Sequence, residues 1–552
     1  MEDKEFNLAQ VFAAVAAANA DRDCIVFGDR RFTFAQTDER ARRFARALHE
    51  WGLGTYRERS DLAPYESGQS HLGLYMANCN EFLEAMLGAY RARVAPFNIN
   101  YRYVADELVY LLGDARADAV MYHARFAPTL ADVLERQHRQ LPLIHVDDGS
   151  GNGPLPGAVR YEELLASVSD EPLDLALSPD DLYVLYTGGT TGMPKGVLWR
   201  QHDIYMNAMG GRNFGTGEMV TSLDEIVERS RPPGPGSMTV APLMHGAAQW
   251  AAFISLCGGR TFVMPPTTTH FDPAEAWALA SRERVVSLSM VGDAFGRPLV
   301  DELESGDYDL SGLLVLITGG AALSAPVKQR FVELLPNLTI LDAGGSSESG
   351  SQMGQVSNRL QSATGRFAPN PGAVVVSEDM ARILSPGDDE IGWLAQQGFI
   401  PLGYLGDPEK TARAFPVIEG IRHSVPGDRA RWCADGQIEL LGRDSVTINS
   451  GGEKIFAEEV EAAIAKHPAV YDVVVTSRPS VRWGNEVVAL VQLADGAHAL
   501  QEGLADSIIV EAARHIARYK LPKAIVFCSR MQRSPSGKAD YRWAKAQVAQ
   551  SV

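Results

Sequence analysis

The chain has 552 residues, more than one hydrophobic core usually holds, so a large domain and at least one smaller domain are expected. Its formal net charge of -18 argues against a nucleic-acid-binding surface, which needs clustered Lys and Arg. The composition, 45% hydrophobic and 22% charged, is that of an ordinary globular protein. An acidic start and the lack of a long apolar run predict neither a secretory signal nor a transmembrane segment. Five dispersed cysteines without a C-x-x-C pair favour a reducing compartment, so a cytoplasmic location is expected.

The elements predicted along the chain alternate between helix and strand, as in layered α/β domains. An amphipathic helix is expected where Ala41, Phe44, Ala45 and Leu48 recur at helical spacing. Short apolar runs predict buried strands at residues 182–185, 285–290 and 313–317. Turns rich in Gly or Thr follow the first and the last run. Because ligands collect at the carboxyl ends of such strands, these turns are candidate binding loops.

Two further regions are predicted towards the C-terminus. Residues 384–441 combine many Gly and Pro with short β-type segments, which indicates a small barrel or a distorted sheet. Beyond them the pattern predicts a separate α+β unit. Its expected elements are a helix at 457–465, strands at 470–476 and 486–493, and a helix at 504–518.

A phosphate-binding loop is predicted directly after the first of the buried strands. Glycines let backbone N–H groups converge on an anion, hydroxyls add donors, and Lys195 adds a positive charge. The loop residues are Thr187, Gly188, Gly189, Thr190, Thr191 and Gly192. The spacing excludes a Walker A loop, because Lys195 is followed by Gly196 and Val197 rather than by Ser or Thr. Taken alone, this segment would also fit an ordinary surface turn.

Other clusters follow in a fixed order along the chain. They are Thr318-Gly319-Gly320-Ala321, Gly345-Ser346-Ser347-Glu348, Pro426-Gly427-Asp428, Gly442-Arg443-Asp444, Gly451-Gly452 and Ser534-Pro535-Ser536-Gly537-Lys538. Each cluster alone is compatible with an ordinary turn, a capping residue or a solvated lysine. A serine hydrolase is disfavoured, because Ser349 stands where the second glycine of G-x-S-x-G belongs. The order and the intervals together, rather than any one cluster, carry the functional interpretation.

Together these clusters resemble the adenylate-forming superfamily, specifically the acyl-CoA synthetases, and the similarity extends over nearly the whole chain. It is strongest with ligases of long-chain and sterol side-chain acids. The resemblance implies an α/β fold with a large N-terminal domain of layered sheets plus a small β-barrel-like part, and a small mobile α+β C-terminal domain. It places the N-terminal adenylation domain at 1–442, the hinge at 443–444 and the C-terminal domain at 445–552. The implied substrates are ATP, coenzyme A and a carboxylic acid, with Mg2+ as the metal ion.

The resemblance also implies a role for each candidate residue. Lys538 is the expected catalytic lysine, and Lys195 screens charge on the phosphates. Glu348 is the expected Mg2+ ligand, a hard oxygen donor suited to a metal that bridges phosphates. His245 lies at the mouth of the acyl pocket. The remaining candidates bind nucleotide or CoA: Gly320 and Ala321 along the adenine and acyl group, Ser346 and Ser347 at the α-phosphate, Asp428 on the ribose, Arg443 at the hinge, and Gly451 and Gly452 at the thiol channel.

One position departs from the superfamily pattern. Many relatives carry an aromatic residue before the glycine of the Ser-Ser-Glu motif, where it stacks on adenine, and this chain has Gly344. Either another apolar side chain covers the adenine or the affinity for nucleotide is reduced.

The sequence leaves three function classes open. The leading one is an ATP-dependent acyl-CoA ligase that activates a lipid acid, either a steroid side-chain acid or a medium- to long-chain fatty acid. The second keeps adenylation but loads the acyl group onto a carrier protein. The third, a nucleotide-binding regulator without catalysis, is disfavoured because Lys195, Glu348, Asp428, Arg443 and Lys538 occur together. The sequence leaves the oligomeric state open, a homodimer included, and predicts no nucleic-acid partner.

Overall fold

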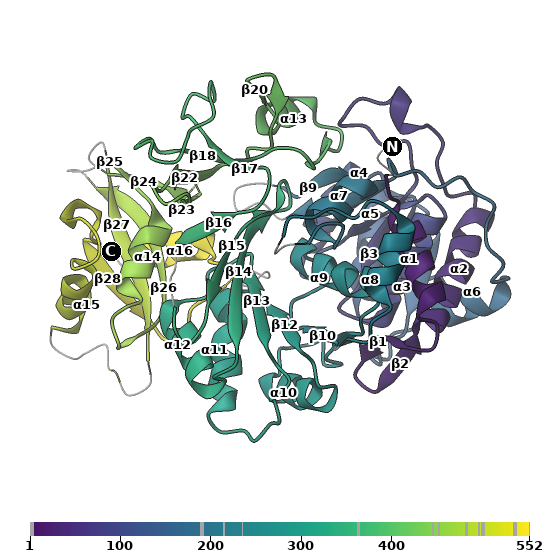
Figure 1. The fold of residues 1–552 in the computed structure, drawn as a ribbon, viewed down its shortest axis with the longest axis horizontal. Helices are drawn as coiled ribbons and strands as arrows, with labels where there is room; N and C mark the ends of the chain where they lie inside the picture. Colours follow the sequence, from purple (N-terminus) through teal and green to yellow (C-terminus); the bar gives the residue numbers. More distant parts are fainter. Residues whose placement is uncertain are drawn as a thin grey trace.

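The structure, a computed structural model, describes most of the chain. The described residues are 5–187, 193–213, 216–234, 236–361, 365–443, 446–450, 453–480, 484–494, 497, 503–533 and 538–550. They form two large sheets with flanking helices and a smaller C-terminal unit at one end of the molecule (Figure 1). None of the helices in these ranges combines the length and apolar character needed to cross a membrane.

An eight-stranded sheet lies in the N-terminal half. Its strands, in spatial order, are β19 (Gly403–Tyr404), β9 (Lys195–Arg200), β8 (Leu182–Thr187), β4 (Ala95–Asn98), β3 (His71–Tyr75), β5 (Ala119–His123), β6 (Leu143–Val146) and β7 (Val159–Arg160). The predicted strand at 182–185 is confirmed as β8, which is parallel to β4 and antiparallel to β9. The phosphate-loop segment therefore connects β8 directly to β9.

A thirteen-stranded sheet lies beside it. Its order is β17 (Ala373–Val376), β18 (Gly392–Gln396), β22 (Asp428–Trp432), β23 (Ile438–Arg443), β16 (Arg366–Pro369), β15 (Gly350–Ser357), β14 (Thr339–Ser346), β13 (Val315–Gly319), β12 (Ser287–Met290), β10 (Ser237–Thr239), β11 (Phe262–Met264), β1 (Asp23–Phe27) and β2 (Arg30–Thr33). The two strands predicted at 285–290 and 313–317 are confirmed as β12 and β13, which are parallel neighbours. The region predicted as a barrel or distorted sheet supplies β18, β22 and β23, which extend this sheet as antiparallel strands.

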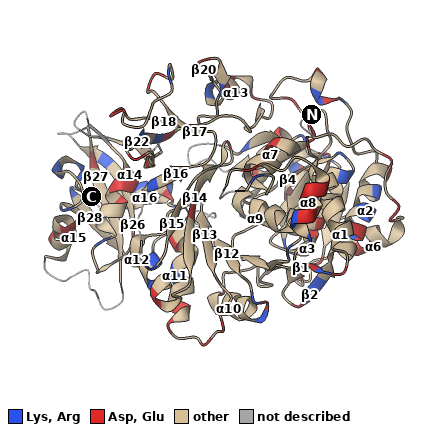
Figure 2. Ribbon diagram, viewed as in Figure 1, with Lys and Arg blue, Asp and Glu red and all other residues tan. Residues whose placement is uncertain are grey.

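Helices cover these sheets. In the N-terminal part they are α1 (Leu8–Ala18), α2 (Phe34–Glu50), α3 (Asn80–Arg91), α4 (Ala105–Asp114), α5 (Ala127–Gln137), α6 (Tyr161–Ser167), α7 (Gln201–Ala208), α8 (Leu223–Ser230), α9 (Gly246–Cys257), α10 (Pro273–Arg282), α11 (Gly292–Leu303), α12 (Ala325–Leu334) and α13 (Pro408–Ala414). The amphipathic helix predicted around residue 45 is α2, whose residues Ala41, Phe44, Ala45 and Leu48 are buried. Charged side chains lie mainly on outer helices and loops, whereas β12 and β13 carry none (Figure 2).

The C-terminal unit is an α+β fold, as predicted. A three-stranded sheet of β26 (Val470–Ser480), β27 (Gly484–Leu493) and β28 (Ala524–Cys528) packs with α14 (Ala457–Ile464), α15 (Leu504–Ala512) and α16 (Tyr541–Gln550). A short hairpin, β24 (Ile448–Ser450) and β25 (Glu453–Ile455), precedes α14. Helix α15 is shorter than the predicted 504–518, because the chain continues in tight turns, with the His515 N–H bonded to the Ala512 carbonyl.

Candidate active site

A cavity of about 970 Å3 lies where the ends of several strands, α9 and the start of α16 meet. This volume is at the upper end of those usual for ligand sites. Four groups of predicted residues lie in its wall: Thr187 at the end of β8, His245 before α9, Gly320 after β13, and Ser346 and Ser347 where β14 ends. Lys538, from the C-terminal unit, lines the same cavity. The tertiary structure thus brings together residues that are separated by about 350 positions in the sequence.

The loop after β14 is held by its own hydrogen bonds. The Ser346 N–H donates to Ser349 Oγ at 3.1 Å, and Ser349 Oγ donates to Gln352 Oε1 at 2.8 Å. From outside the loop, Trp199 Nε1 donates to the Ser347 carbonyl at 2.9 Å. Ser349 is therefore a buried residue whose hydroxyl holds this loop together.

Tyr404 links the two predicted charge-handling residues. Its hydroxyl donates to Glu348 Oε1 at 3.0 Å, and Lys195 Nζ lies 4.9 Å from the centroid of its ring. The phenol thus orients the carboxylate, while the ring face stabilises the lysine cation. Tyr404 was missed from the sequence, because it lies 56 residues from Glu348 and belongs to no cluster that drew attention.

Gly320 and Lys538 lie close together at one end of the cavity, here called the reaction end. Gly320 has φ of +78°, and a Cβ built on it would lie 3.8 Å from Lys538 Cε. A glycine here allows the left-handed backbone, while a Cβ would make only an ordinary van der Waals contact with the lysine. Ala321, also expected to bind nucleotide, is not among the cavity-lining residues, because its methyl group packs towards Gly292.

On the C-terminal side of the cavity, Tyr541 lies next to two carboxylates. Burial raises the pKa of Tyr541 and the neighbouring Glu461 and Glu458 raise it further, so the phenol stays neutral. Burial also raises the pKa of Glu461 to about 8, although the Val475 N–H donates to its Oε1 at 2.8 Å. The Tyr541 phenol therefore adds no negative charge to this wall, where Asp540 is the acidic side chain that lines the cavity.

Asp428 and Arg443 lie opposite each other on β22 and β23. Asp428 stands outside the set of residues that line the cavity, and the side chain of Arg443 is outside the described part of the structure. Seven other predicted positions also lie outside it: Gly188, Gly189, Thr190, Thr191, Gly192, Gly451 and Gly452. The hinge residue Asp444 is not described either.

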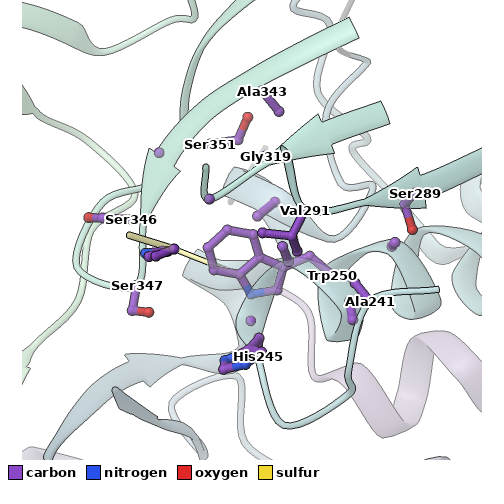
Figure 3. Close-up of a pocket in the computed structure, with 18 of the residues that line it drawn as sticks. Ala241, His245, Trp250, Ser289, Val291, Gly319, Ala343, Ser346, Ser347 and Ser351 are labelled. Carbon is purple, nitrogen blue, oxygen red and sulfur yellow. The ribbon is translucent and has the colours of Figure 1, made fainter. Parts of the chain in front are cut away.

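Behind His245, the cavity becomes an apolar chamber between α9 and one face of the large sheet. The strands β12 and β13 alternate buried and half-exposed residues, and the half-exposed ones, such as Ser289 and Ile317, face the cavity. The Trp250 indole stands in the middle of the chamber, near His245 (Figure 3). This arrangement leaves sheet surface uncovered for a bulky apolar ligand.

Met353 occupies the space beside Gly344. The two residues are partners across β14 and β15, and a Cβ built on Gly344 would lie 2.7 Å from Met353 Cγ and 2.8 Å from Met353 Cε. Met353 is buried and lines the cavity. A flexible thioether thus lies where an aromatic side chain would begin.

Gly344→Tyr is therefore expected to be destabilising by about 1–3 kcal/mol, because overpacking forces Met353 to move. In the double variant with Met353→Ala this conflict is absent, so the two changes should couple by at least ~1 kcal/mol. Thermal unfolding of both single variants and the double variant measures that coupling, and the KM for ATP shows whether the new ring stacks on adenine. Strictly additive losses of stability would contradict the packing described above.

Comparison with known proteins agrees with this geometry. The family model described as AMP-binding enzyme matches residues 12–398, and the AMP-binding enzyme C-terminal domain matches residues 459–538. The chain belongs to the AMP-binding enzyme family. It is 56% identical over 545 residues to the medium-chain acyl-CoA ligase Mig of Mycobacterium avium, covering 98% of both chains. It is 38% identical to the 3-oxocholest-4-en-26-oate–CoA ligase of Rhodococcus rhodochrous, over 98% of this chain and 96% of that one.

Solved structures with the same fold include the anthranilate CoA ligase AuaEII in complex with anthranoyl-AMP. It has a TM-score of 0.80 at 19% identity, over 99% of this chain and 98% of the other. ATP-bound MatB from Rhodopseudomonas palustris has a TM-score of 0.78 at 21% identity, covering 98% of each chain. The predicted family, the fold class and the enzyme class of an AMP-forming acid–thiol ligase are confirmed, and with them the substrates ATP and CoA and the ion Mg2+.

Proposed function

We propose that this AMP-binding enzyme activates a medium-chain or bulkier lipid carboxylic acid, either a fatty acid or a steroid side-chain acid, and transfers it to coenzyme A. One observation carries the proposal: a single cavity joins the Ser346–Ser347 loop and Lys538 to the apolar chamber behind His245. The relatives named above, a medium-chain ligase and a sterol-acid ligase, support the same substrate classes.

The chemistry follows from what each group has to do. A carboxylate oxygen attacks the α-phosphorus of ATP, the α–β phosphoanhydride bond breaks, and pyrophosphate leaves with its electron pair. Two anions are brought together in this step, so Lys538 and Lys195 stabilise the charge that builds up on the phosphates. The thiol of CoA then attacks the acyl carbonyl, its proton passes to solvent, and AMP leaves.

Glu348 would hold the Mg2+ ion. A carboxylate is the oxygen ligand that Mg2+ prefers, usually with phosphate oxygens completing its shell. Tyr404 fixes Oε1 of this carboxylate, which orients the group before nucleotide binds. When bound, the ion neutralises charge on the phosphates.

The domain division expected from the sequence stays part of this proposal, with residues 1–442 and 445–552 turning about a hinge at 443–444. Lys538 reaches the cavity in the present arrangement, which suits adenylation. Its loop would obstruct the thiol in the second step, so a rotation has to remove it. The cytoplasmic location stays a prediction, and the oligomeric state, a homodimer included, stays open.

The contact between the two parts offers a test of this division. The Tyr471 ring lies 4.8 Å from Arg297 Cζ, and its hydroxyl donates to Asp301 Oδ2 at 3.5 Å. Tyr471→Ala is expected to slow adenylation roughly threefold, because a cation–π contact that holds Lys538 in place is lost. Thioester formation from supplied acyl-AMP should not slow. Tyr519→Ala, at an exposed tyrosine of the same unit, is the control. An equal loss in both half-reactions would contradict the role of Tyr471 in holding the C-terminal unit in the adenylation arrangement.

The function itself is tested by mass spectrometry of acyl-CoA formed with ATP, Mg2+ and CoA. The acid panel runs from short fatty acids to steroid side-chain acids. We expect CoA esters of medium-chain or bulkier acids. Acyl-AMP that accumulates without CoA ester would instead indicate a carrier-protein acceptor, and the absence of pyrophosphate release with every acid would overturn the proposal.

A further inference from the structure

Part of the apolar chamber behind His245 carries hydroxyl groups, although an aliphatic substrate would need only hydrocarbon there. Ser287 and Ser289 lie on β12, Ser237 lies on the neighbouring β10, and Ser255 lies on α9. All four line the cavity. The neighbouring strands of the same sheet present apolar side chains to the cavity, with Ile317 on β13, Leu341 on β14 and Val356 on β15.

The strand register gives the depth of these hydroxyls. Ser289 is level with Ile317 and Ser287 with Val315, two and four residues before Gly319. At about 3.3 Å per residue, Ser289 and Ser287 lie roughly 7 and 13 Å from the level of Gly319, the last residue of β13. Ser237 pairs with Ser287 at the deeper level. Figure 3 shows Ser289 on the far side of the Trp250 indole from Ser346 and Ser347.

The hydrogen bonds of this cluster are incomplete. Ser255 Oγ donates to the Ala251 carbonyl at 3.0 Å and bonds to the Ser237 hydroxyl, whereas Ser289 Oγ donates to the Met238 carbonyl over 3.4 Å, a long contact. The Ser287 hydroxyl has no hydrogen-bond partner among the described residues, although the side chain is half-buried and faces the cavity. An aliphatic chain laid over this wall would remove water from these hydroxyls without replacing its hydrogen bonds.

The part of the cavity near Ser287 and Ser289 is lined by no charged side chain among the described residues. The charged side chains that line the cavity come from residues 102–107 and 538–542, and none in the described ranges comes from β10, β12 or α9. A second carboxylate or an amine on the substrate would therefore be buried here without a counter-ion. A neutral oxygen, which accepts hydrogen bonds from the serines and tolerates the apolar side chains beside them, suits this surface better.

From these observations we infer that the preferred acid carries a neutral oxygen, a hydroxyl or a ketone, at the far end from its carboxylate, and that Ser287, Ser237 and Ser289 recognise it. This inference rests on the proposed ligase function and names its substrate class more closely. A site built to bond such an oxygen selects against the analogue that lacks it, because its own polar groups are then left unpaired.

The test compares matched acids that differ only in the distal oxygen. One arm uses ω-hydroxy fatty acids against the unsubstituted acids of the same length, over a series of lengths. The other arm uses a steroid side-chain acid with a ring ketone against its deoxo analogue. We expect kcat/KM to favour the oxygenated acid about tenfold in at least one arm, and the arm identifies whether the oxygen belongs to a chain or to a ring system.

The Ser287→Ala variant should reduce that ratio several-fold, whereas Ser287→Thr, which keeps the hydroxyl, should retain most of it. Ser281→Ala, on α10 outside the cavity wall, is the matched control and should show the wild-type ratio. Equal kcat/KM for both members of every pair, or a ratio unchanged in Ser287→Ala, would overturn the inference. Failure of all acids to yield a CoA ester would be a failure of the proposed function instead.

Discussion

Lys538→Ala is expected to slow acyl-adenylate formation by about 10²- to 10³-fold, because a positive group next to the reacting phosphates is lost. In the structure Lys538 approaches the left-handed Gly320 at the end of the cavity where we propose that adenylation takes place. The loss should be seen as slower pyrophosphate release in a single-turnover measurement with the acid and ATP. Thioester formation from supplied acyl-AMP should change much less, since the lysine is not needed there.

A matched control separates this effect from a general loss of charge. Lys545, exposed on α16 of the same unit, lies outside the cavity wall, and Lys545→Ala should adenylate at the wild-type rate. Lys538→Arg tests whether charge alone is sufficient or whether the compact ammonium is required. A Lys538→Ala enzyme with undiminished adenylation would remove this lysine from the mechanism.

Glu348→Gln is expected to reduce adenylation by about 10²-fold and to raise the Mg2+ concentration needed for half-maximal rate, because a neutral amide is a weaker ligand for the ion. The amide oxygen can still accept the bond from Tyr404, so the fold around it should be retained. The measurement is a Mg2+ titration of pyrophosphate release, with thermal unfolding as the check on folding.

Tyr404→Phe provides the comparison for that result. It removes only the hydrogen bond to Glu348 Oε1 and keeps the ring that lies against Lys195. A loss of about 0.5–1.5 kcal/mol, a few-fold in rate, is expected. If Glu348→Gln showed the wild-type rate at every Mg2+ concentration, the carboxylate would have no part in holding the ion.

Much of the fold and the reaction end could be predicted from the sequence. The strands at β8, β12 and β13 and the α+β nature of the C-terminal unit follow from local periodicity, which depends on residues a few positions apart. Gly320 was indicated only by the resemblance to the family, and its positive φ, which favours glycine, was seen in the structure.

The end of α15 shows where local patterns fail. The apolar spacing continues past Ala512, but the helix stops and tight turns follow. Helix ends depend on capping and on packing against neighbours, which periodicity alone does not encode.

Order along the chain was sufficient to determine the adenylate-forming family, because its motifs are short, contiguous and restricted in residue type, whereas the roles of the single residues in them stay predictions. Only the tertiary structure decided how Tyr404 orients Glu348, how Met353 fills the space at Gly344, and which residues form the acyl wall. The serines of that wall come from β10, β12 and α9, and each alone is an unremarkable surface-type residue. Their meaning arises from strand register and side-chain packing between distant segments, and such long-range contacts leave no local signature in the sequence.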